Sequence, residues 1–205
     1  MKSLLESFQW VRRSARDLVE DRSALAAVEF AIIVPLMLVM FFGTVEFSSG
    51  IAVKRKVTLI ARTLSDLTSQ SVSVADTDLT NFFAASTAIA TPYSATPIQS
   101  TISELWIDPA TSNARVQWSS GLAPRLVGSL VSIPSTLIVK DAAGNTLPNQ
   151  YLIFSEVSYL YKPTIGYVMV KGGVNLTDVA YTRPRQSLCV IYPTPSAGFP
   201  PCPTS

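Results

Sequence analysis

Residues 23–47, SALAAVEFAIIVPLMLVMFFGTVEF, constrain the fold more than any other part of the chain. The uncharged interior of this stretch, residues 30–45, is 16 residues long and is bounded by Glu29 and Glu46. Residues 24–47 would form a helix of about 36 Å, long enough to cross the roughly 30 Å hydrocarbon core of a bilayer. The mean hydropathy of +0.32, with only 15% charged residues, agrees with a membrane segment. We therefore expect one membrane-spanning helix with a glutamate near each end, where a carboxylate costs less than at the bilayer centre.

The same stretch admits two other interpretations. A secretory signal has an apolar core of about 7 to 15 residues that is followed by a cleavage site of small residues. An ordinary single-span anchor would carry the two glutamates by accident.

The orientation of the helix depends on the basic residues on either side of it, because an excess of them marks the cytoplasmic side. They number five in residues 1–22 and four in residues 54–62. Charge alone therefore leaves the orientation of the helix open.

The composition excludes several classes of function. Histidine is absent, which removes nucleophiles that depend on an imidazole base and every zinc site that contains histidine. The 16 basic and 14 acidic residues give a net charge of +2 without a long basic run, so nucleic-acid binding is not expected. No glycine-rich phosphate loop or nucleophile elbow occurs. We expect no enzyme, no cofactor and no metal, with an anchored hydrolase as the alternative, since paired carboxylates need no linear motif.

The residues SALAAVEFAIIVP, followed by FGTVEF and KRKVTLIARTLSDL, resemble the N-terminal domain of the TadE/TadG-like family over about residues 22–65. This family comprises pseudopilins and assembly proteins of the tight-adherence (Flp, type IVb) pilus. The resemblance implies a prepilin-type processing site, in which a small residue is followed by four residues and then by Glu-Phe. Ala24 is then the residue before the cut, Leu25 the new N-terminus, Glu29 the fifth residue of the processed chain and Phe30 the sixth. Alanine at position 24 departs from the glycine that is usual there.

The resemblance also implies a role for the helix and a set of partners. The expected packing and assembly residues are Glu29, Phe30, Pro35, Gly43, Glu46 and Phe47. The implied partners are a prepilin peptidase, other pseudopilins and the inner-membrane platform of pilus assembly. The N-terminus is expected in the cytoplasm and the rest of the chain in the periplasm of a bacterium. The alternative is an uncut, single-span periplasmic scaffold or binding module.

Glu29 would have a chemical use in a processed helix. A carboxylate near a helix N-terminus is favoured by the helix dipole and by free backbone N–H groups. A cut between Ala24 and Leu25 would add an α-amine four residues before Glu29. That amine would neutralise the carboxylate, either in its own chain or in a packed neighbour.

Beyond the apolar stretch, the pattern predicts an amphipathic stalk. Apolar residues recur at helical spacing from Val57 to Leu67, with polar residues between them. The basic residues 54–56 are expected at the membrane surface, with contact to an acidic pilus partner as the alternative. A short helix over residues 79–90 follows, with Asp76 or Thr77 as its cap, and the aspartates of this DTD sequence suit capping better than calcium binding.

The remaining chain has the pattern of an antiparallel sheet with about four to six strands. Residues 98–108 and 114–120 alternate around the turn residues PATSN and predict a hairpin, and further strands are expected over 135–141, 149–161 and within 164–185. The predicted fold class is α+β, with a long N-terminal membrane helix that continues as a stalk packed on the sheet, as in pilins. The expected parts are a leader (1–24), a membrane helix (25–47), a stalk (48–70), a periplasmic domain (71–192) and a proline-rich tail (193–205).

Cys189 and Cys202 are the only cysteines, and they lie near the C-terminus among prolines. A core thiol is not expected in such a segment. An exported pair that forms one disulfide is the favoured interpretation. Two free thiols in the tail are the alternative.

Overall fold

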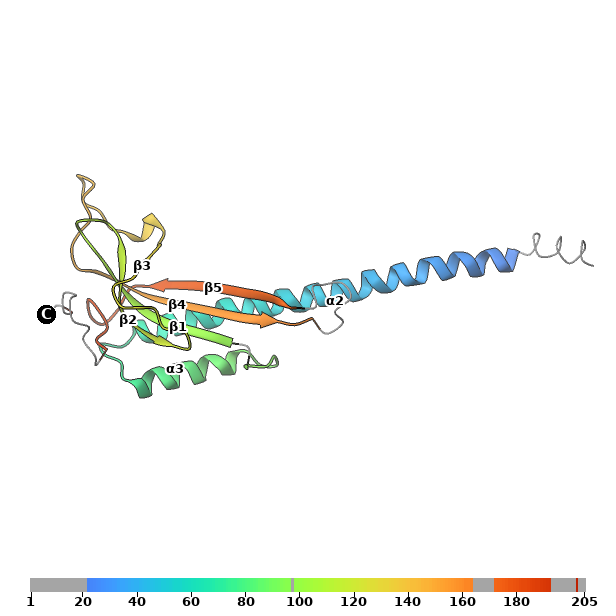
Figure 1. The fold of residues 1–205 in the computed structure, drawn as a ribbon, viewed down its shortest axis with the longest axis horizontal. Helices are drawn as coiled ribbons and strands as arrows, with labels where there is room; N and C mark the ends of the chain where they lie inside the picture. Colours follow the sequence, from blue (N-terminus) through green and yellow to red (C-terminus); the bar gives the residue numbers. More distant parts are fainter. Residues whose placement is uncertain (1–21, 97, 164–171, 193–201, 203–205) are drawn as a thin grey trace, which may run out of the picture. The chain divides into compact units, whose positions relative to one another are not determined.

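The computed structural model describes residues 22–96, 98–163, 172–192 and 202. The chain divides into two compact units, Met1–Ser48 and Ser49–Ser205. The described part of the first unit is helical, and the described part of the second unit contains the end of α2 (Arg22–Ser69), helix α3 (Asp76–Ile89), a short 3-10 helix and one sheet (Figure 1). A long apolar helix followed by an antiparallel sheet confirms the predicted α+β class.

Helix α2 (Arg22–Ser69) is 48 residues long and includes Pro35. Proline has no N–H, so the carbonyl of Ala31 loses its usual helical partner. The helix continues on both sides of this position, as membrane helices often do. The predicted continuation of the apolar helix into a stalk is confirmed, and residues 49–69 of α2 are called the stalk below.

The sheet contains five strands in the order β3-β2-β1-β4-β5, and each neighbouring pair is antiparallel. The strands are β1 (Ile98–Ile107), β2 (Ala114–Gly121), β3 (Leu130–Val131), β4 (Gln150–Tyr161) and β5 (Val174–Thr182). The central strands β1 and β4 pair along their length, from Ile98 opposite Tyr159 to Ile107 opposite Gln150. The predicted hairpin and the strand over residues 149–161 are confirmed. Part of the expected strand region 164–185 lies outside the described residues.

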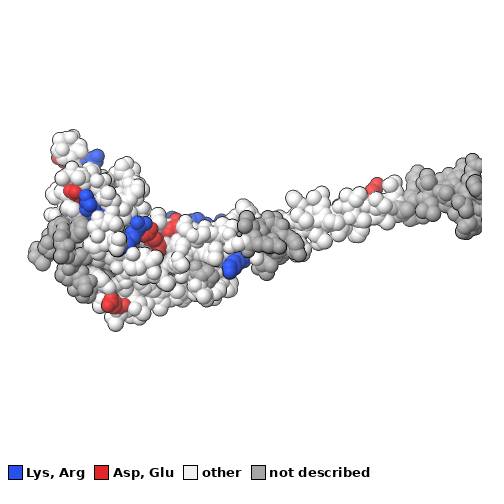
Figure 2. Space-filling view, viewed as in Figure 1, with Lys and Arg blue, Asp and Glu red and all other residues white. Residues whose placement is uncertain are grey.

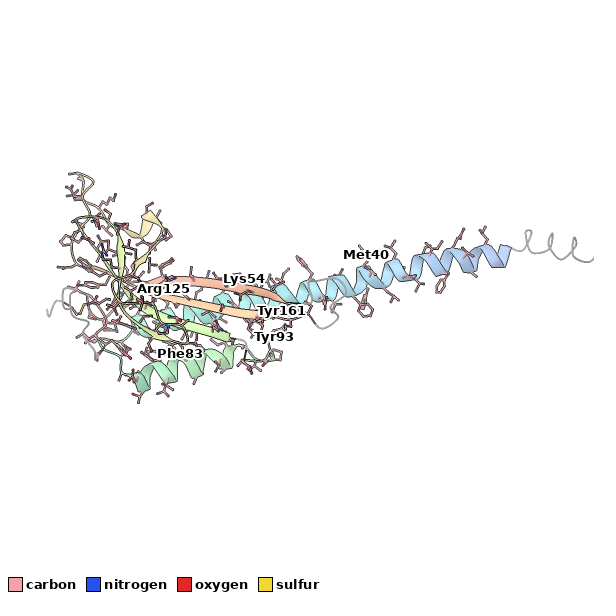
Figure 3. The ribbon with its side chains drawn as sticks, in the orientation of Figure 1. Met40, Lys54, Phe83, Tyr93, Arg125 and Tyr161 are labelled. Carbon is pink, nitrogen blue, oxygen red and sulfur yellow. A yellow bond between two sulfur atoms is a disulfide. The ribbon has the colours of Figure 1, made fainter. Side chains whose placement is uncertain are left out.

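The stalk and helix α3 (Asp76–Ile89) pack with one face of the sheet in a single apolar core. The stalk contributes Val53, Val57, Ile60, Ala61 and Leu64, each at most 1% exposed. On the sheet side the core includes Ile102, Trp118, Ile153 and Val157, and Phe83 and Tyr93 pack against it from α3 and the segment after it (Figure 3). Each fully buried aliphatic side chain contributes about 1.5–3 kcal/mol. The predicted amphipathic stripe of the stalk is therefore the main attachment between helix and sheet.

The other face of the sheet has a smaller core, and here one predicted strand is wrong. Residues 135–141 were expected to form a strand, but Ser135–Leu137 is a short 3-10 helix that follows Pro134. The side-chain amide of Gln150 pairs with the backbone N–H and C=O of Val139 (2.7 and 2.8 Å), which replaces the hydrogen bonds of a strand neighbour. Leu137 and Ile138 still pack against buried residues of this core. The apolar residues that suggested a strand are therefore apolar because they pack on this core.

The cap of α3 also differs from the prediction. The N-cap is Ala75, and neither Asp76 nor Thr77 occupies that position. Asp78 reaches back to accept the backbone N–H of Ala75 at 2.9 Å, which satisfies a donor at the helix start. Asp76 accepts a hydrogen bond from the hydroxyl of Tyr192. Both aspartates therefore accept hydrogen bonds from other residues of the domain.

Cys189 and Cys202 form a disulfide, as the favoured interpretation predicted. The expected position outside a core is wrong for Cys189, which is completely buried. Its neighbour Val190 belongs to the apolar core beneath the stalk and α3. The rest of the predicted tail, residues 193–201 and 203–205, lies outside the described residues.

Candidate functional site

The apolar segment of α2, residues 25–47, is the first candidate site. It belongs to the helix that, among the described residues, is long and apolar enough to cross a membrane, with a mean hydropathy of 2.5 in its most apolar window. None of that window is buried. Figure 2 shows that this segment is almost free of charged side chains, whereas Lys, Arg, Asp and Glu appear on the second unit. A continuous exposed apolar surface of this kind requires lipid or other apolar helices to cover it.

The two glutamates of the segment have different surroundings. Glu29 is exposed, whereas Glu46 is only 3% exposed. Glu46 lies 17 positions after Glu29 in the helix, about 26 Å along the axis, which is close to the roughly 30 Å hydrocarbon thickness of a bilayer. The burial of Glu46 was not predicted. Glu29 is the carboxylate that the segment presents outward.

The other predicted assembly residues lie along the same helix. Phe30, Pro35 and Phe47 are exposed, and Gly43 is half-buried. The backbone at Ala24 and Leu25 is helical. Leu25 and Glu29 are four residues apart and therefore lie on one face, about 6 Å apart between Cβ atoms. An amine created at Leu25 would be within reach of the Glu29 carboxylate.

Lys54, one of the basic residues 54–56 that were expected at the membrane surface, has polar partners within the domain. The Lys54 ammonium donates to the carbonyl of Thr177 in β5 and lies 3.3 Å from Oδ2 of Asp178 (Figure 3 labels Lys54). Thr58 donates to the same carboxylate. Burial alone would raise the pKa of Asp178, but hydrogen bonds from Thr58 and Lys54 hold it below its usual range. Lys54 therefore ties the stalk to β5 and covers a carbonyl on an edge strand, where an open backbone would invite aggregation.

A groove of about 490 Å³ is lined by residues of β1, β4 and β5 together with Ala123 and Arg125. Arg125, labelled in Figure 3, lines this groove, and its guanidinium makes two hydrogen bonds to Glu156 at 2.5 and 2.6 Å. This pairing raises the pKa of Arg125. The described residues contain no group of three His, Cys, Asp or Glu side chains that could hold a metal ion. Arg125 and Glu156 therefore neutralise each other's charge in this groove.

Glu104 forms a buried polar cluster that the sequence analysis missed. Its carboxylate is completely buried in β1 and accepts the backbone N–H of Val190 at 2.6 Å and the indole N–H of Trp118 at 2.9 Å. Burial raises its pKa to about 8, against the lowering effect of these two hydrogen bonds. A glutamate inside the alternating strand ISELWI was the available signal. Nothing local to that strand identifies Val190 as its partner.

These features define an α+β protein with one candidate membrane span and no recognisable catalytic constellation among its described residues. Residues 25–64 match the family model described as TadE-like protein, which confirms the resemblance found in the sequence. The matched region contains the apolar segment and most of the stalk, and it ends at the buried Leu64. No curated protein and no solved structure matches the chain.

Proposed function

We propose that this protein is a TadE-like pseudopilin or assembly protein of the tight-adherence (Flp, type IVb) pilus and promotes pilus biogenesis and surface adherence. The observation that carries the proposal is the TadE-like match over residues 25–64, which coincides with an exposed apolar helix. Glu29 is exposed on this helix, one turn after Leu25. The protein acts by packing its membrane helix against those of other pilus components.

The proposed chemistry is selective helix packing. In lipid, helices associate through close packing and hydrogen bonds, because the surrounding acyl chains are as apolar as leucine. An unpaired carboxylate is costly there, so Glu29 favours a neighbour that presents an amine at the same depth. The processed N-terminus at Leu25 would supply such an amine in its own chain, and the corresponding residue of another pseudopilin would supply it in a complex.

We also propose an orientation, with residues 1–24 in the cytoplasm and the sheet domain in the periplasm. The Cys189–Cys202 disulfide supports this orientation, because disulfides persist in oxidising compartments such as the bacterial periplasm. The partners in this arrangement are the prepilin peptidase, other pseudopilins and the inner-membrane assembly platform.

Intact mass and N-terminal sequencing of the membrane-extracted chain test the processing step. In cells that contain the prepilin peptidase, we expect a chain that starts at Leu25, and in cells without it a chain that starts at Met1. Ala24→Leu should block the cut because the site takes a small residue, whereas Ala24→Gly should preserve it. An intact Met1 in the presence of the active peptidase would instead identify an uncut anchor, which is the scaffold or binding module of the alternative.

Glu29→Gln tests helix packing separately from processing. The variant should still insert into the membrane, since the neutral amide lowers the cost of burial in lipid. Recovery of partner pseudopilins with the tagged chain should fall by roughly tenfold, as expected for the loss of about 1.4 kcal/mol of pairing energy. Met40→Leu, at an exposed apolar position of the same segment, is the control and should leave recovery unchanged. Equal recovery with Glu29→Gln and with the unmodified chain would contradict the role of the carboxylate.

A further inference from the structure

Residues 185–192, called the C-terminal strap below, connect two parts of the sheet domain. On one side the strap makes backbone hydrogen bonds to the last residue of α2 and to the connection between α2 and α3. The backbone N–H of Arg185 donates to Ser69 (2.9 Å), that of Ile191 donates to Val72 (3.0 Å), and Ile191 accepts from Val74 (2.9 Å). These bonds include a short parallel bridge between Ser73 and Ile191. The strap therefore fixes the start of α3.

On its other side the strap is bound to the sheet by the Glu104 cluster. Glu104 in β1 accepts the N–H of Val190 at 2.6 Å. The indole N–H of Trp118 in β2 is shared between the Glu104 carboxylate (2.9 Å) and the carbonyl of Val190 (2.8 Å). The ring of Tyr192 lies 5.3 Å from that of Trp118. One buried carboxylate and one indole thus recognise both backbone groups of a single strap residue.

The disulfide is attached directly to this contact. Cys189 precedes Val190 and is completely buried, whereas Cys202 is half-buried. The two sulfur atoms therefore differ in their access to a reagent from solution. Thiol–disulfide exchange requires a thiolate to reach one sulfur, and the other sulfur then leaves.

We propose that Cys202 is the site at which a thiol reductant opens this disulfide, and that opening releases the C-terminal strap from Glu104 and from the α2–α3 connection. The fitting partner is a dithiol–disulfide oxidoreductase of the compartment that holds the domain. The inference is independent of a pilus role, because it rests only on contacts within the second unit.

The chemical step is balanced by the reductant. A thiolate attacks the sulfur of Cys202, the bond to Cys189 breaks, and Cys189 leaves as a thiolate that takes up a proton. A second thiol of the reductant then resolves the mixed disulfide at Cys202. The net reaction converts the protein disulfide and a dithiol into two protein thiols and the oxidised reductant. Closure of the strap is the same reaction in reverse, with an oxidised partner.

The position of attack is tested with reduced glutathione on the full chain in detergent. After a short exposure and acid quenching, peptide mass spectrometry should find the glutathione adduct on Cys202 and a free thiol at Cys189. The same treatment of urea-unfolded chain is the control and should give adducts at both cysteines. Adducts at Cys189, adducts at both positions in folded chain, or no reaction of folded chain would each overturn the proposal.

Release of the strap is tested by amide hydrogen exchange of the oxidised and the reduced full chain. Reduction should speed exchange at Val74, Val190 and Ile191 by at least about tenfold, while the central β1–β4 amides keep their protection. The double variant Cys189→Ala/Cys202→Ala should reproduce the reduced pattern if it folds, and the reduced natural chain provides the result if it does not. Unchanged exchange at the strap overturns its release, and so does a uniform increase across the sheet, since that would show only a general loss of stability.

Discussion

The sheet domain is expected to lose stability as the pH rises from 5 to 8, and Glu104 is the responsible group. Its side chain is completely buried, and burial raises its pKa from 4.5 to about 8 despite hydrogen bonds from Val190 and Trp118. The folded chain therefore holds a proton that the unfolded chain releases over this interval. The contribution of Glu104 is fully present below pH 4.5 and is lost as the pH rises through 8. Between pH 5 and 8 the free energy of unfolding should fall by roughly 3 kcal/mol.

Guanidinium unfolding of the full chain in detergent, followed by near-ultraviolet circular dichroism at several pH values, measures this effect. The interval is free of histidine titration because the sequence has no histidine. Aspartates with a lowered pKa, such as Asp178, titrate below this interval. Glu104→Gln imitates the neutral acid and should make stability nearly independent of pH, whereas Glu156→Gln should leave the slope in place. If the pH dependence persists in Glu104→Gln, the effect belongs to another group. Greater stability at pH 8 than at pH 5 would contradict the predicted loss.

The parts of the fold that were predicted correctly depend on local patterns. The stalk was predicted from apolar residues at helical spacing, and burial of Val57, Ile60 and Leu64 follows from that spacing alone. The β1–β2 hairpin was predicted from alternating residues on either side of a turn. In both cases neighbours in sequence determine which face of the element is apolar, so no distant contact has to be known.

The features that were missed or wrongly predicted depend on contacts between residues far apart in the chain. Lys54 was expected at a membrane surface, and its partners on β5, 123 residues away at Thr177, were not predicted. The strand expected over residues 135–141 is replaced by a short 3-10 helix and by backbone at Val139 that pairs with the side chain of Gln150. Glu104 and Val190 are 86 residues apart. A charge or an apolar run in the sequence shows that a partner is needed without showing which residue it is.

The candidate membrane site was predicted more completely than the polar sites of the domain. Its residues occupy one continuous helix, so a family pattern and a hydropathy profile identify the segment together. Glu29 is exposed on this apolar helix, as expected for a segment that meets lipid or other helices. Burial of Glu46 does not follow from the pattern, because the same spacing is compatible with either environment.

Leu64→Ala is expected to destabilise the sheet domain by about 2–5 kcal/mol. Leu64 is completely buried between the stalk and the sheet, so the substitution removes apolar contact and leaves a cavity that rigid β-structure closes poorly. The free energy of unfolding, measured by guanidinium denaturation of the full chain in detergent at pH 6, would report the loss. The slope of the transition should stay the same if the change acts on stability alone.

Leu59→Ala supplies the matched control, since Leu59 lies on the same stalk with 48% of its surface exposed. Its substitution should change the free energy of unfolding by no more than about 0.5–1 kcal/mol. A large difference between the two leucines would mean that the stalk stabilises the domain through one face. Equal losses would contradict packing of the stalk on the sheet. Because the TadE-like match ends at Leu64, the comparison also tests whether the family segment carries the contact that holds this sheet to its helix.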